Sequence, residues 1–84
     1  MILRAEFTTE PFEGEGEPPA HAVAARDALR TAGLEPDFGP LGTAIQGDRQ
    51  TVLAALGEVL DVALGAGAAR ITLQVTAEEA TTEE

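Results

Sequence analysis

The sequence lacks most of the side chains that enzymes use for catalysis. It has no cysteine, no serine and no lysine, and His21 is its only histidine. A Ser-His-Asp or Cys-His catalytic site is therefore excluded within one chain. A metal site would have to combine His21 with the Glu-Gly-Glu-Gly-Glu segment at 13–17, whose spacing matches no metal-binding motif. We expect a protein that is not an enzyme and that has no metal and no cofactor.

The remaining polar residues fall at strand ends, where they could contact a ligand. Thr8 and Thr9 end one alternating segment, Thr43 begins another, and His21 follows Pro18-Pro19 at a predicted helix start. If the two segments are antiparallel neighbours, these residues meet at one rim of a sheet, beside the free amides of the helix. Threonine is also an ordinary strand residue, so the spacing alone leaves both interpretations open.

Hydrophobic periodicity predicts the elements that would position these residues. Alternation predicts strands at 2–9, 43–47 and 70–76, and Pro36 indicates a short edge strand at 35–39. Apolar spacings of three and four predict helices at 21–32 and 49–66, the second capped by Asp48. Because crossover connections are right-handed, this order predicts an α+β, ferredoxin-like βαββαβ fold. It has a four-stranded antiparallel sheet with both helices on one face.

Length and charge limit the class of protein. The 84 residues make a single domain, 1–84, and we expect the acidic tail 77–84 to be mobile. The net charge of −10 argues against nucleic acid and anionic membranes as partners. No apolar run is long enough for a signal peptide or a membrane span, and a cytoplasmic protein is expected.

Two surfaces remain uncovered in the predicted fold. The open sheet face would carry polar and small side chains and could be hydrated or paired with another sheet; its members are Arg4, Glu6, Thr8, Ala44, Gln46, Thr72, Gln74 and Thr76. The second helix has a second apolar stripe, which a small monomer does not need; its members are Leu53, Gly57, Leu60 and Leu64. We predict a homo-oligomer, dimer or tetramer, that forms through this stripe. The alternative is that the stripe is the flank of the core.

Three segments of the sequence stand out: GLEPDFGPLGTAIQGD at 33–48, AEFTTEP at 5–11 and GAARITLQV at 67–75. They resemble motifs of the YkoF-like thiamine-binding family, also called the UPF0045 or DUF77 group. The segment GLEPDFGPLGTAIQGD at 33–48 is similar to the family's Gly-Leu, short strand and Pro-Met-Gly-Thr pattern, and it retains Gly42 and Thr43. The segment AEFTTEP at 5–11 retains Glu6 and has Thr8 in place of serine. GAARITLQV at 67–75 is similar to the family's last strand. Gln46 departs from the pattern, because it replaces a glutamate.

The resemblance implies a ferredoxin-like protomer, assembled as a dimer of dimers or a tandem pair, that carries or supplies thiamine or its pyrimidine moiety. An aminopyrimidine could hydrogen-bond with Thr8, Thr43 and Gln46, and a carboxylate would favour the thiazolium cation. We therefore assign the ligand-binding residues as Glu6, Thr8, Thr43, Gln46 and Phe38, the last for stacking. The alternative function is a ligand-free structural or regulatory oligomeric module with the same fold.

Strand alternation predicts that the residues assigned to this site do not all face the same side of the sheet. Thr43 shares its parity with Ile45 and would face the helices, whereas Thr8 and Gln46 would face away from them. A β-bulge near Gly42, or a pocket built from two chains, would reconcile the two directions.

Overall fold

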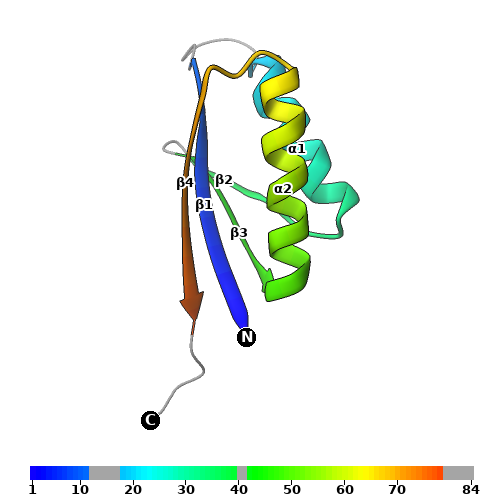
Figure 1. Ribbon diagram of the computed structural model, residues 1–84, viewed down its shortest axis with the longest axis vertical. Coiled ribbons are helices and arrows are strands. Elements are labelled where there is room, and N and C mark those ends of the chain that lie inside the picture. The colour runs from blue at the N-terminus through cyan, green and yellow to red at the C-terminus, as the bar shows by residue number, and fades with distance from the viewer. Residues whose placement is uncertain (12–17, 40–41, 79–84) are drawn as a thin grey trace.

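The structure is a computed structural model that describes residues 1–11, 18–39 and 42–78. The elements follow the predicted order, strand, helix, strand, strand, helix, strand (Figure 1). Their bounds are β1 (Ile2–Glu10), α1 (Ala20–Thr31), β2 (Asp37–Gly39), β3 (Gly42–Asp48), α2 (Arg49–Gly65) and β4 (Arg70–Glu78). β4 continues through 77 and 78, two residues beyond the end that the alternation predicts for this strand. Residues 79–84 lie outside the described part of the chain.

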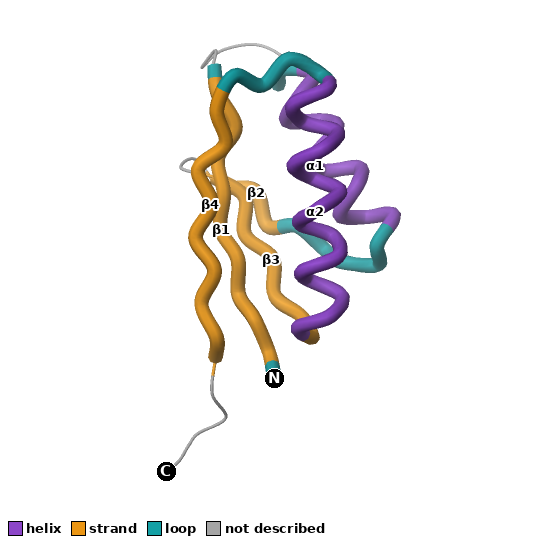
Figure 2. The backbone as a smooth tube through the Cα atoms, viewed as in Figure 1, coloured by secondary structure: helices purple, strands orange, loops and turns teal. Residues whose placement is uncertain are grey.

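The fold is α+β with an antiparallel sheet, as predicted. The strand order is β2-β3-β1-β4, and each neighbouring pair is antiparallel (Figure 2). β1, β3 and β4 form the body of the sheet, and β2 adds only three residues beside the start of β3. Both helices lie on the same side of the sheet, with α1 packed on α2 and α2 packed on β3 and β1.

The core lies between the sheet and the two helices. Alternate residues of β1, Leu3, Ala5 and Phe7, are buried there, because successive side chains of a strand point to opposite faces. The helices bury Leu29, Val52 and Val59 against them, together with smaller alanines. This cluster contains the predicted inward positions of β1 and most of those of the helices, whereas Leu73 and Val75, which the alternation of β4 also predicts to face inward, stay exposed.

Local signals determine where the helices begin and end. The Asp48 carboxylate accepts hydrogen bonds from the Thr51 amide, at 3.0 Å, and the Thr51 hydroxyl, at 2.8 Å. These bonds favour the ionised form and hold the pKa of Asp48 below its usual value. α1 ends at Thr31, and Gly33 follows with a φ of +86°, which is accessible to glycine. The Leu34 amide bonds back to the Leu29 carbonyl. The Asp48 cap confirms the sequence prediction.

The register determines which residues share the open face of the sheet. Glu6 lies opposite Ala44 on β3 and Gln74 on β4. Phe7 lies opposite Thr43 and belongs to the other, helix-covered face. The alternation therefore places the eight predicted open-face residues on one side, as expected.

Candidate functional site

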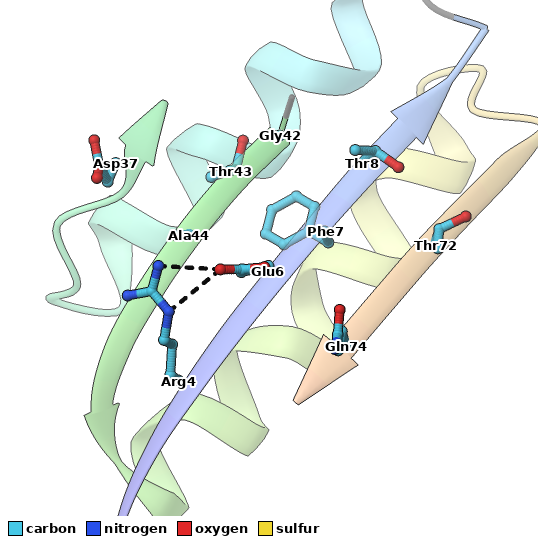
Figure 3. Close-up of a pocket in the computed structure, with 10 residues that line it drawn as sticks. All are labelled: Arg4, Glu6, Phe7, Thr8, Asp37, Gly42, Thr43, Ala44, Thr72 and Gln74. Carbon is cyan, nitrogen blue, oxygen red and sulfur yellow. Dashed lines mark hydrogen bonds and ion pairs between the residues drawn. The ribbon is translucent and has the colours of Figure 1, made fainter. Parts of the chain in front are cut away.

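A hollow of about 460 Å³ lies on the open face of the sheet, over β3, β1 and β4 (Figure 3). Ten residues line it: Arg4, Glu6, Phe7, Thr8, Asp37, Gly42, Thr43, Ala44, Thr72 and Gln74. Its volume is within the usual range for small-molecule sites, about 300–1,000 Å³. Its lining includes carboxylates, a guanidinium, hydroxyls and an amide, which suit a polar ligand.

Cross-strand pairing builds the hollow. Asp37, Ala44, Glu6 and Gln74 form one continuous row, because each lies opposite the next on adjacent strands. Thr8 and Thr72 lie opposite each other two residues further along β1 and β4, on the same face of the sheet. Ala44 and Gly42 have the smallest side chains of the lining, so β3 leaves space between the longer side chains of its neighbours.

The charged groups of the hollow are paired only in part. Arg4 donates from Nη2 at 3.0 Å and from Nε at 3.3 Å, and both bonds end on Glu6 Oε2 (Figure 3). The second oxygen of Glu6, Oε1, is therefore available to a ligand. Asp37 brings another carboxylate, so the lining holds two acidic groups and one basic group. This balance favours a cation, or a neutral ligand rich in donors.

Two of the five predicted ligand residues, Glu6 and Thr8, line the hollow from the open face. Thr43 also contributes to the lining, but only 8% of it is exposed and it lies on the helix-covered side, opposite Phe7. The β1–β3 register is continuous from Ile2 to Phe7, so the bulge that could have turned Thr43 outward is absent from these pairs.

Of the other two predicted ligand residues, only Gln46 has a side chain that the structure describes. Gln46 donates from Nε2 to Glu78 Oε1 at 2.8 Å and is not part of the lining. This contact exists because β4 extends far enough to bring Glu78 to the open face beside Gln46. Phe38 pairs through its backbone with Thr43, and its side chain lies outside what the structure describes.

A family model for thiamine-binding proteins matches residues 5–84, which is nearly the whole chain and includes all but one residue of the hollow lining. The chain belongs to the thiamine-binding protein family. No curated protein is significantly similar to it in sequence.

Solved structures share the fold of this family member at low sequence identity. A protein from Streptococcus pneumoniae superposes with a TM-score of 0.74 at 18% identity, over 95% of this chain and 90% of that one. A Bacillus cereus domain of unknown function, DUF77, gives 0.70 at 14% identity, over 99% and 82%. A Thermotoga maritima protein, provisionally assigned to thiamine biosynthesis or salvage, gives 0.65 at 17% identity, over 90% and 81%. At such identities the likeness establishes the fold alone.

Several lining residues were not assigned to the site from the sequence. Arg4, Thr72 and Gln74 were predicted to share the open face with Glu6, and their common parity was the signal that could have grouped them. Asp37 gave no such signal. It reaches the hollow only because β2 pairs with β3 in a register that places it opposite Ala44.

His21, in the first turn of α1, is buried, with 4% exposure. Its Nε2 lies 3.0 Å from the Pro11 carbonyl oxygen, and its Nδ1 lies 2.7 Å from Thr9 Oγ1. Because a carbonyl only accepts, Nε2 carries a proton and donates it, and in the neutral ring Nδ1 accepts from the Thr9 hydroxyl. His21 therefore joins the start of α1 to the end of β1.

We expect His21→Ala to lower the free energy of unfolding by about 2 kcal/mol, because the Thr9 hydroxyl and the Pro11 carbonyl lose a buried partner. Urea denaturation followed by circular dichroism measures this change. Thr8→Val is the control, because it removes a neighbouring hydroxyl on the opposite face of the strand. A loss below about 0.5 kcal/mol for His21→Ala, the level of an ordinary surface change, would contradict a structural role.

Neither a metal centre nor a membrane span is indicated in the described part of the chain. No group of three or more histidine or acidic side chains there is arranged to hold a metal ion. The segment 13–17, from which a metal site would have drawn its carboxylates, lies outside the described residues. None of the described helices is long and apolar enough to cross a membrane.

Proposed function

We propose that this chain binds thiamine, or a related pyrimidine precursor, in the hollow of the open sheet face, and that it acts as a carrier or supply protein without catalysis. One observation carries the proposal. In a chain of the thiamine-binding family, the Glu6 carboxylate has one oxygen that no described residue bonds, and it lies in a hollow that hydroxyl and amide groups also line.

The chemistry of the ligand is compatible with that lining. Thiamine combines an aminopyrimidine, which has donors and acceptors, with a thiazolium cation. The hydroxyls of Thr8 and Thr72 and the amide of Gln74 can meet the ring. Glu6 and Asp37 would attract the cation, opposed by Arg4. Relative to the sequence prediction, this proposal keeps Glu6 and Thr8 and replaces Gln46, whose amide bonds to Glu78.

We also propose a ferredoxin-like fold and a homo-oligomeric assembly for this chain. The strand order β2-β3-β1-β4 and the element order support a ferredoxin-like fold. Leu53, Leu60 and Leu64 on α2 are 51%, 36% and 53% exposed, which supports a homo-oligomer through this helix. The cytoplasm remains our prediction for where the protein acts.

Calorimetric titration tests the ligand. We expect saturable heat with thiamine and weaker binding of its uncharged pyrimidine half, because the latter lacks the cation. Ala44→Leu fills the floor of the hollow and should abolish binding, whereas Thr76→Leu, on the same face but outside the lining, should retain it. Absence of heat at millimolar thiamine, with the protein shown to be folded, would reject the carrier function. It would favour the ligand-free interaction module.

A further inference from the structure

Arg4 lies at the edge of the hollow, among polar side chains of three strands. On the open face it is opposite Gln46 of β3 and Thr76 of β4. Glu6 is the next residue of β1 on that face. The guanidinium donates from both Nε and Nη2 to one oxygen of Glu6 (Figure 3). Arg4 therefore places a positive charge beside the carboxylate that we assign to the cation of the ligand.

A second carboxylate lies within reach of Arg4. Glu78 follows Thr76 by two residues on the same face of β4, which makes it a diagonal neighbour of Arg4. Such diagonal neighbours are about 7–8 Å apart, and long side chains span that distance. Arg4 nevertheless pairs with Glu6, at 3.0 Å.

The side chain of Gln46 bonds to Glu78. Its Nε2 donates to Glu78 Oε1 at 2.8 Å. Gln46 lies opposite Arg4, whereas Glu78 lies opposite Ile2, so this bond crosses β1 between Ile2 and Arg4. Arg4 thus has the bond between Gln46 and Glu78 on one side along the strand and Glu6 on the other.

We propose that Gln46 is a positioning residue that determines how strongly the hollow prefers a cationic ligand to a neutral one. By bonding to Glu78, Gln46 leaves Glu6 as the partner of Arg4. An arginine bonded to Glu6 offsets part of the charge of that carboxylate, so a thiazolium is attracted less strongly. A neutral pyrimidine is not affected in this way. The effect on ligands rests on the proposed function, whereas the positioning of Arg4 does not.

This role requires an amide at position 46, because an amide can donate a hydrogen bond to a carboxylate. An ionised carboxylate at that position only accepts, so it could not bond to Glu78. It would lie directly opposite Arg4 and offer the guanidinium a new partner across the strand. Gln46→Glu should therefore draw Arg4 away and leave both oxygens of Glu6 to the ligand.

The side-chain NMR signal of Arg4 Nε–H tests this arrangement without any ligand. Arg4→Gln identifies the signal among those of the five arginines by its loss. In the wild-type background, Glu6→Gln should shift the signal, because the bond from Nε ends on Glu6. In the Gln46→Glu background the same change should leave the signal nearly unshifted. Equal shifts in the two backgrounds would overturn the proposal.

Calorimetric titration measures the selectivity as the ratio of the dissociation constants of the uncharged pyrimidine half and of thiamine. Gln46→Glu should raise this ratio about threefold, an effect of the size of an exposed ion pair. Gln50→Glu is the matched control, because it is the same substitution at an exposed position of α2, outside the lining of the hollow. Equal increases for the two variants would show that net charge, and not the position of Arg4, determines the selectivity.

A double-mutant cycle shows whether position 46 acts through Arg4. Arg4→Gln alone should also raise the ratio about threefold, because it removes the charge that opposes the cation. Adding Gln46→Glu to Arg4→Gln should then give no further increase, because the group through which it acts is gone. Additive effects would mean that the new carboxylate attracts the ligand directly, and they would refute the positioning role.

The failure of this inference can be distinguished from the failure of the proposed function. If the Arg4 signal behaves as expected in a protein that takes up no thiamine, the thiamine site is rejected and the positioning of Arg4 is retained. If thiamine binds but Glu6→Gln shifts the Arg4 signal equally in both backgrounds, the positioning is rejected and the site is retained.

Discussion

Glu6→Gln is expected to weaken thiamine binding about tenfold, which corresponds to the lower end of a hydrogen bond to a charged group, about 1.5 kcal/mol. Both bonds from Arg4 end on Oε2, so the other oxygen of Glu6 is the one that a cation in the hollow would meet. Glutamine keeps the shape of the side chain and removes its charge. Calorimetric titration of the two proteins at the same ionic strength gives the ratio of affinities.

A second glutamate separates the local effect of Glu6 from the general acidity of the chain. Glu58 is exposed on α2, on the other side of the sheet from the hollow, and Glu58→Gln changes the net charge by the same amount. We expect it to leave the affinity nearly unchanged, because charges beyond about 10 Å are screened at ordinary salt. Equal losses for the two variants would show that the acidic field of the protein, and not Glu6, attracts the ligand.

Gly42→Ala should destabilise the fold by about 2–3 kcal/mol, an amount typical of a strained backbone position. The φ of Gly42 is +156°, and a Cβ there would lie 2.8 Å from the Phe7 carbonyl oxygen and 3.0 Å from Thr8 Cγ2. The carbonyl belongs to β1, which is held between β3 and β4 and has little freedom to move. Urea denaturation should show the loss, and the melting temperature should fall by about 10 °C or more.

Gly57→Ala is the matched control for this substitution. Gly57 lies within α2, and a Cβ there would meet no atom within 4 Å. Alanine in a helix interior is favoured over glycine by about 0.5–1 kcal/mol, so this variant should be more stable than the wild type. If Gly42→Ala were as well tolerated as Gly57→Ala, the close approach of β3 to β1 at the hollow would be wrong.

The elements of the fold could be predicted because their signals are local. Alternation in β1 and β4, the Asp48 cap and the glycine after α1 each involve only a few consecutive residues. The open face followed from the same alternation, since parity and strand order determine which side chains share a face. The parity of Thr43 already indicated that it would face the helices, and the structure confirms that direction.

The site itself depended on information that a local pattern does not contain. The Gln46 amide donates a hydrogen bond to the Glu78 carboxylate. This contact across the sheet forms because β4 runs two residues beyond its predicted end. Asp37 depends on the register of a three-residue strand. His21 is buried, and its ring lies within hydrogen-bonding distance of both Thr9 and Pro11. Each of these contacts joins residues distant in sequence.

The two edges of the sheet differ greatly in length, three residues in β2 and nine in β4. A sheet with two long free edges could add copies at both sides and grow into an open fibre. Here β2 offers too short a row of backbone groups to accept a full strand, so only one edge can recruit another molecule. A sheet that can add strands at one edge alone stops growing once that edge is covered, so the short β2 limits open-ended aggregation.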